Sequence, residues 1–99
     1  MGTPAPERRT GPRYCVELQV RFEGGEGVTR DVSLDGICFL STAGFKVRQT
    51  LDLSIVFMGA VARAEATVLR LESAPAGGFT VAARLDLQGL GPLHEERGR

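Results

Sequence analysis

The chain has 99 residues, of which 42% are hydrophobic and 24% are charged, and its 12 Lys and Arg balance its 12 Asp and Glu. This length allows one domain with a modest core, and the zero net charge argues against a broad nucleic-acid footprint, which needs many cations on one face. No apolar run approaches the roughly 20 residues that span a membrane, and the N-terminus lacks the apolar centre of a secretory signal. We therefore expect a cytoplasmic protein that does not contact a membrane.

The first residues, 1–13, read "MGTPAPERRTGPR" and form a polar segment with a charge cluster. We predict a flexible arm here, which orders only when it binds something, followed by a single domain at 14–99. The arm crowds Arg8, Arg9 and Arg13 into six positions of a chain that is neutral overall.

Hydrophobic residues alternate with polar ones along most of the remaining chain, which is the pattern of half-buried β-strands. Glycine-rich turns such as "EGGEG" and the pair Met58-Gly59 separate these segments, and small alanines at every second position from Ala60 to Ala66 indicate a tightly packed barrel wall. We predict an all-β fold, a six-stranded antiparallel β-barrel, with a short helical or irregular C-terminal tail from Gly91. The predicted strands are 14–22, 28–32, 37–41, 51–57, 60–72 and 79–87.

The arginine cluster is the first motif with chemical meaning. Between Arg9 and Arg13, a Gly-Pro pair bends the backbone, so that several guanidinium groups can aim at one point. Planar guanidinium groups donate paired hydrogen bonds to phosphates and guanine edges, and they stack over aromatic rings. The alternative is an exposed arm whose charges are simply solvated.

The second motif is "DVSLDG", residues 31–36. Asp31 and Ser33 lie two positions apart, so on an extended strand both side chains project to one face. The carboxylate can accept two N–H bonds from a guanine edge, the hydroxyl can donate to a phosphate, and Gly36 lets a ligand approach the bare backbone. Alternatively, Asp31 and Ser33 form a side-chain-stabilised turn between two strands.

An RxxxR motif (Arg9, Arg13) and a later DxSxxG motif (Asp31, Ser33, Gly36), with 17 residues between Arg13 and Asp31, resemble the PilZ domain family over essentially the whole chain. PilZ domains are bacterial receptors for the second messenger cyclic di-GMP, built on a six-stranded barrel that commonly carries a C-terminal helix. The resemblance implies that the two arginines clamp phosphates and guanine faces, while the DxSxxG residues form the part of the site on the barrel.

The resemblance also implies that Arg8 helps to hold a second, intercalated copy of the ligand. It further implies no cofactor besides cyclic di-GMP, and an effector protein that receives the signal. The C-terminal segment is shorter than in many family members, which puts a role for a terminal helix in doubt. Two alternatives stay open: a PilZ-like interaction module that binds no nucleotide, and a small barrel that binds single-stranded nucleic acid, although the neutral charge and the scarcity of exposed aromatics oppose the latter.

An enzyme is the least favoured class, because the single histidine, His94, has no evident nucleophile as a partner. The same argument makes a zinc site improbable on sequence grounds, and we expect no metal. Cys15 and Cys38 lie in strand-like sequence, so we expect two buried, reduced thiols, with a disulfide or a metal pair as alternatives.

Overall fold

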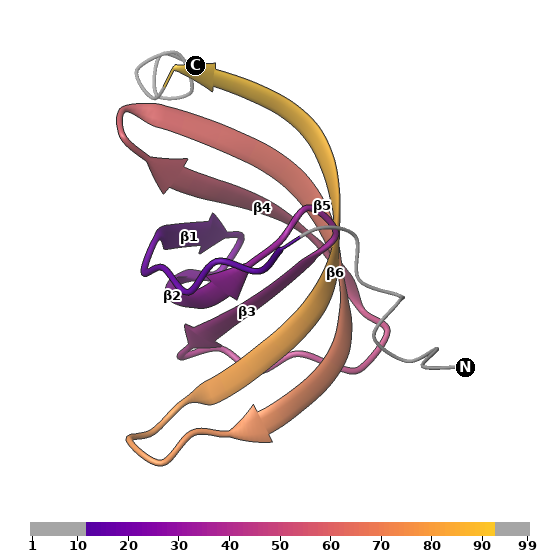
Figure 1. The fold of residues 1–99 in the computed structure, drawn as a ribbon. Coiled ribbons are helices and arrows are strands. Elements are labelled where there is room, and N and C mark those ends of the chain that lie inside the picture. The colour runs from indigo at the N-terminus through magenta and orange to yellow at the C-terminus, as the bar shows by residue number, and fades with distance from the viewer. Residues whose placement is uncertain (1–11, 93–99) are drawn as a thin grey trace, which may run out of the picture.

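The computed structural model describes residues 12–92, and these form one closed antiparallel barrel with the strand order β1-β2-β3-β6-β5-β4 (Figure 1). The predicted six-stranded, all-β fold is confirmed. None of the described residues belongs to a helix capable of crossing a membrane. The strands are β1 (Gln19–Phe22), β2 (Gly25–Val32), β3 (Gly36–Ser41), β4 (Thr50–Phe57), β5 (Ala60–Ser73) and β6 (Phe79–Pro92).

The two longest strands, β5 and β6, have 14 residues each and curve along the whole length of the barrel (Figure 1). β4 and β5 are joined at Met58 and Gly59, whose φ angles of 49° and 78° lie in the left-handed region that two-residue hairpin turns require. The predicted turn at this position is confirmed. The β1–β2 hairpin likewise turns at Glu23 and Gly24, with φ of 96° at the glycine.

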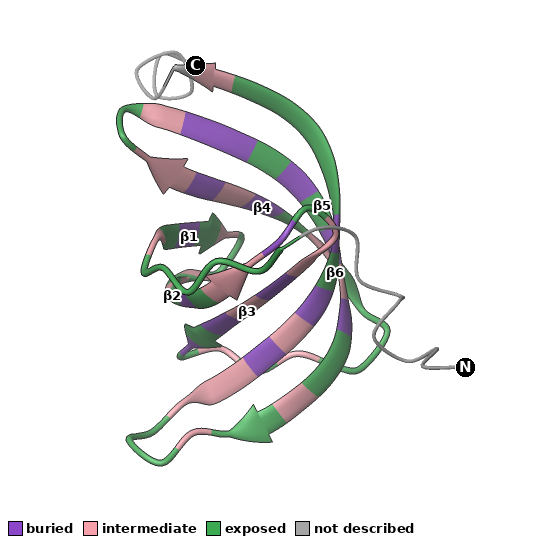
Figure 2. Cartoon of the chain, viewed as in Figure 1, coloured by how far each residue is buried: buried purple, intermediate pink, exposed green. Residues whose placement is uncertain are grey.

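Buried and exposed residues alternate along the strands, so one face of each strand lines the interior (Figure 2). The predicted alanine face of β5 is part of this interior: Ala62, Ala64 and Ala66 are 7%, 2% and 0% exposed. Their small side chains leave room for larger ones in the same core, among them Phe39 of β3, which is fully buried. The core thus follows the period-two pattern of the sequence.

The first strand is shorter than predicted. β1 begins at Gln19, and the preceding residues contact β2 through an isolated bridge between Tyr14 and Val32 and through hydrogen bonds with Thr29. The reason is the buried Thr29, whose hydroxyl accepts from the N–H of Leu18 at 2.8 Å and donates to the carbonyl of Val16 at 2.6 Å. A side chain replaces backbone partners there, so the regular strand ladder is interrupted.

The last strand is longer than predicted. The alternation of the sequence ends at Leu87, but in the structure an irregularity leaves Gln88 without a partner on β5, and the pairing continues beyond it to Ala60 opposite Pro92. Gly91 and Pro92, assigned above to the tail, therefore belong to β6. The remainder of the predicted tail, 93–99, lies outside the described residues, as does the arm up to residue 11.

Candidate functional site

The two motifs meet at one ion pair. The side chain of Arg13 binds the Oδ1 atom of Asp31 through both Nε, at 3.1 Å, and Nη2. The next residue, Tyr14, exchanges two backbone hydrogen bonds with Val32, of 2.8 and 2.9 Å. These bonds fix the chain beside β2, so the arginine that ends the RxxxR motif lies directly on the first residue of the DxSxxG motif.

A β-bulge orients Asp31. In the β2–β3 ladder Thr29 is opposite Phe39, and Asp31 is opposite Cys38, so Arg30 is the extra residue. Thr29 points into the core, and without the bulge Asp31 would follow it inward. The bulge shifts the alternation by one residue, and the Asp31 side chain remains 26% exposed on the outer surface, where it meets the guanidinium.

Ser33 does not share this outer face. β2 ends at Val32, so Ser33 lies in the following loop and is only 6% exposed. Its N–H donates to the carbonyl of Gly36 at 2.8 Å, and its hydroxyl donates to Oδ1 of Asp35 at 3.1 Å. The expectation that Asp31 and Ser33 project together from a straight strand is therefore wrong. Ser33 stabilises the turn, as the alternative interpretation proposed.

Gly36 lies at the centre of this cluster. A Cβ atom built on it would lie 3.5 Å from the Ser33 hydroxyl, 3.7 Å from the carbonyl oxygen of Ala83 and 3.8 Å from Nη1 of Arg13. These are ordinary van der Waals distances, and the backbone φ is not in the left-handed region. The barrel therefore tolerates a side chain at position 36, and the glycine mainly keeps the surface beside Arg13 open.

Two further arginines border the same surface, and the motifs did not reveal them. A hollow of about 690 Å³ beside Gly36 is also lined by Arg70 of β5 and Arg84 of β6. Arg84 is directly opposite Gly36 in the β3–β6 ladder, and Arg70 is opposite Ala82, which is itself opposite Cys38. Only the strand register brings them to the site, because both are distant in sequence from the motifs and look like ordinary exposed strand residues.

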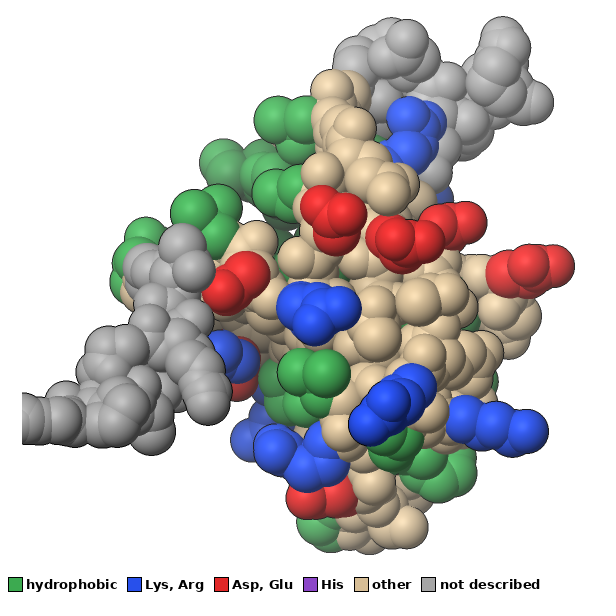
Figure 3. Space-filling view, turned by 90° about the vertical axis from the view of Figure 1, so that its right-hand side faces the viewer, with side chains coloured by type: hydrophobic (Ala, Val, Ile, Leu, Met, Phe, Trp, Pro, Cys, Tyr) green, Lys and Arg blue, Asp and Glu red, His purple; other side chains and the backbone are tan. Residues whose placement is uncertain are grey.

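The hollow and the ion pair together form a surface with several cations and two partly buried carboxylates, Asp31 and Asp35. Figure 3 shows, for one face of the molecule, that basic side chains gather in groups with acidic side chains between and above them. Acidic and basic side chains are thus unevenly distributed on this face, although the chain is neutral overall. Arg8 and Arg9 lie outside the described residues, so their predicted contribution stays a prediction.

Cys38 lies in the centre of this surface. Partial burial raises the pKa of its thiol above the usual range, the negative charge of Asp31 raises it further, and the nearby arginines at 30, 70 and 13 oppose the shift without reversing it. Both cysteines are free thiols, and Cys15 is exposed. The expectation of burial is wrong for Cys15 and only partly met by Cys38, and the expectation that both thiols are reduced stays a prediction.

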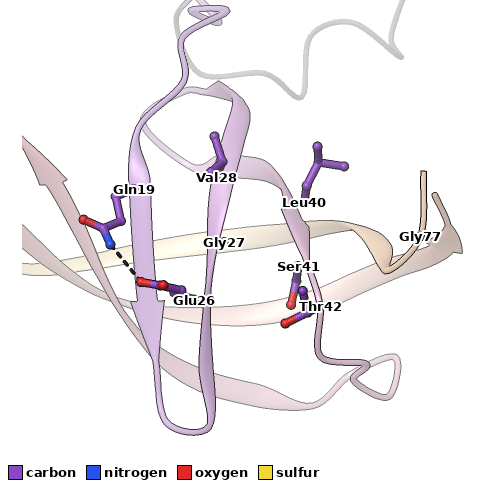
Figure 4. Close-up of a pocket in the computed structure, with 8 residues that line it drawn as sticks. All are labelled: Gln19, Glu26, Gly27, Val28, Leu40, Ser41, Thr42 and Gly77. Carbon is purple, nitrogen blue, oxygen red and sulfur yellow. Dashed lines mark hydrogen bonds between the residues drawn. The ribbon is translucent and has the colours of Figure 1, made fainter. Parts of the chain in front are cut away.

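A second hollow, formed by β1, β2 and β3 with the β5–β6 turn, is a poor match for an anionic ligand. It is drawn in Figure 4, and among the described residues that line it the one charged side chain is that of Glu26, which accepts a hydrogen bond of 2.8 Å from the amide of Gln19. A carboxylate repels phosphates, and residues 12–92 contribute no cation to this hollow. The basic surface around Arg13 is therefore the candidate site.

Comparison with known proteins identifies a structural relative but no sequence family. No protein-family model matches the chain, and no curated protein matches it in sequence. The chain is similar in structure to the Bacillus subtilis inhibitor of motility, MotI/DgrA, with a TM-score of 0.69 and 18% sequence identity. The match covers 97% of this chain and 51% of that one, so the chain spans about half the length of MotI/DgrA. At 18% sequence identity, the structural similarity shows that this chain and MotI/DgrA share a fold.

Proposed function

We propose that this chain is a PilZ-like module that binds cyclic di-GMP on the surface around Arg13, Asp31 and Gly36. The observation that carries the proposal is the ion pair between Arg13 and Asp31, because it joins two motifs that are 18 positions apart in the sequence. The fold likeness to MotI/DgrA is compatible with such a module. In this proposal the protein is cytoplasmic and non-enzymatic, uses no cofactor, and passes the signal to an effector protein.

The chemistry of the site suits a cyclic dinucleotide, which presents two guanine edges and two phosphates. A guanidinium has five N–H donors, and Arg13 directs only its Nε and Nη2 donors to Asp31. Its remaining donors serve a phosphate, while the Asp31 carboxylate accepts from the N–H groups of a guanine. Arg70 and Arg84 add charge on the other side of Gly36, where an anionic ligand gains from each cation.

The energy balance requires several contacts to act together. A hydrogen bond to a charged group contributes about 1.5–3 kcal/mol, while fixing each residue of the arm costs about 1–2 kcal/mol. Arg9 is four positions from Arg13, and each residue spans at most about 3.6 Å, so its guanidinium can reach the same surface. We propose that Arg8 and Arg9 close over the ligand from the arm, and that Arg8 serves a second copy of the ligand.

Isothermal titration with cyclic di-GMP tests this function. We expect Arg13→Ala to lower the affinity at least tenfold, because it removes a phosphate ligand and leaves Asp31 unpaired. The matched control is Arg21→Ala, which removes an exposed arginine from β1, away from the site. Equal affinities of Arg13→Ala and the unmodified protein would refute the assignment, provided that circular dichroism shows both to be folded.

A second candidate is a PilZ-like interaction module that binds no nucleotide. It is favoured by the fact that Arg13 and Asp31 already satisfy each other and that the Ser33 hydroxyl is used within its loop. Thermal unfolding separates the two candidates, since a ligand at 100 times its dissociation constant stabilises the native state by about 2.7 kcal/mol. No stabilisation by millimolar cyclic di-GMP would select the second candidate, while salt-sensitive binding of single-stranded oligonucleotides would select a nucleic-acid-binding barrel.

A further inference from the structure

Two leucines of β6 face the inside of the barrel but are not covered by it. Leu87 is opposite Ala64 and Leu90 is opposite Ala62 in the β5–β6 ladder. Residues directly opposite each other point to the same face of a sheet, and the two alanines are buried, at 2% and 7% exposure. The leucines beside them are nevertheless 49% and 71% exposed. This inner face therefore lacks a covering layer.

Leu87 lines an apolar hollow at one end of the barrel, which we call the mouth, and Leu90 follows three residues later on the same strand. Its volume is about 670 Å³, and Tyr14, Leu34 and Met58 on its wall are 60%, 64% and 97% exposed. No charged side chain is among the described residues that line it. The lining consists of Pro12, Tyr14, Val16, Leu18, Val32, Ser33, Leu34, Ile55, Phe57, Met58, Ala62, Leu85 and Leu87.

The mouth also has an unpaired strand edge. β6 pairs with β3 only as far as Arg84, and Leu85 then donates its N–H to the carbonyl of Asp35 at 3.0 Å. Within residues 12–92, no strand pairing or backbone hydrogen bond is found on that edge from Asp86 to Gly91, although the opposite edge stays paired with β5. In Figure 1 this end of β6 lies beside β5 alone. Exposed edges of this kind are templates for another strand.

We propose that the mouth is an interface between two copies of this chain, which pair antiparallel along the free edges of their β6 strands. An antiparallel pair of identical edges is related by a two-fold axis, so one surface complements itself without a second binding site. Two copies do not repel each other there, since the lining is uncharged and the chain is neutral overall.

Sedimentation equilibrium without nucleotide tests the interface, so the outcome is independent of the proposed function. We expect the protein to approach twice its chain mass of 10.6 kDa as its concentration rises. The double variant Leu87→Glu, Leu90→Glu is expected to stay monomeric, because it places charges on the inner face of both copies. The matched control, Val47→Glu, changes a residue that is 54% exposed in the β3–β4 loop, outside the mouth, and is expected to dimerise normally.

Two results would overturn the proposal: a monomer at every concentration of the unmodified protein, or a dimer that persists in the folded double variant. The first result would assign the mouth to a different protein partner. If the double variant does not fold, hydrogen exchange of the unmodified protein decides instead. The amides on the free edge of residues 86–91 must then exchange more slowly at high protein concentration than at low concentration, and equal rates would exclude the interface.

Discussion

Cys38 lies directly opposite Asp31 in the β2–β3 ladder, and through Ala82 it is connected in register to Arg70. The Cys38 thiol therefore lies in a row of paired residues that crosses β2, β3, β6 and β5. In this row it is placed between Asp31 and Arg70 of the candidate site. This position makes Cys38 a chemical reporter of the site that requires no substitution there.

The thiol reactivity of Cys38 should respond to pH and to ligand. Because burial and the negative charge of Asp31 raise the pKa of the Cys38 thiol, little thiolate is present at neutral pH, and the thiolate is the form that alkylates. In a Cys15→Ser variant, which leaves one thiol, we expect slow labelling by iodoacetamide at pH 7 and a rate that increases steadily as the pH is raised. Cyclic di-GMP should slow the labelling measured at alkaline pH, as it covers the surface.

The control for this experiment is Cys38→Ser, in which only the exposed Cys15 reacts. We expect its labelling to be faster at pH 7, because Cys15 is exposed. Equal rates for the two cysteines at neutral pH would contradict the raised pKa of Cys38. A ligand that binds by calorimetry but leaves the labelling of Cys38 unchanged would place the binding surface elsewhere.

The architecture could be predicted from the sequence because its signals are local. Period-two alternation in segments such as Leu53 to Phe57, and turns such as Met58-Gly59, are determined by neighbouring residues, and the barrel follows from their order. The bulges could not be predicted, because one extra residue at Arg30 or Gln88 depends on the partner strand. The same limitation explains why the first strand was predicted too long and the last too short.

The candidate site was predictable only in part, for the same physical reason. The two motifs are contiguous stretches, so Arg13, Asp31 and Gly36 could be selected from the sequence, and the structure brings them together. Arg70 and Arg84 enter through strand register over long separations, which a single sequence does not reveal. Whether any of these residues binds cyclic di-GMP stays a prediction.

The arginines that only the register revealed can be tested directly. If Arg70 and Arg84 contribute to ligand binding, Arg70→Ala and Arg84→Ala should each weaken cyclic di-GMP binding by several-fold, through loss of a cation near the phosphates. Arg70 also forms an exposed ion pair with Glu72, with 3.3 Å between Nε and Oε2. Such pairs contribute about 0–1 kcal/mol, so thermal stability should change little.

Calorimetry and thermal unfolding of the same preparations check this prediction. Glu72→Ala is the matched control, since it removes the ion pair but no cation, and its affinity should be unchanged or slightly higher. Unchanged binding in both arginine variants would confine the site to the two motifs.

A substitution at Gly36 should separate binding from folding. Gly36→Ala adds a Cβ atom that meets its nearest neighbours at 3.5 Å or more, so the barrel should unfold at nearly the same temperature. The methyl group occupies the surface between Ser33 and Arg13, however, and a larger side chain such as Gly36→Leu should block a ligand there. We expect the affinity for cyclic di-GMP to fall moderately with alanine and strongly with leucine. A folded Gly36→Leu variant with normal affinity would show that the ligand does not approach position 36.

The alanine face of β5 predicts where the barrel cannot accept larger side chains. Ala66 is fully buried, lies opposite Leu51 and Leu85 in its two ladders, and belongs to the core. Adding three carbon atoms there forces neighbouring side chains out of their preferred rotamers, which costs about 1–3 kcal/mol. Ala66→Leu should therefore lower the free energy of unfolding in urea by that amount. Ala82→Leu is the control, because Ala82 lies on the outer face of β6 and is only partly buried, and its stability should change by less. Equal stability of Ala66→Leu and the unmodified protein would mean that the interior holds unfilled space at this position.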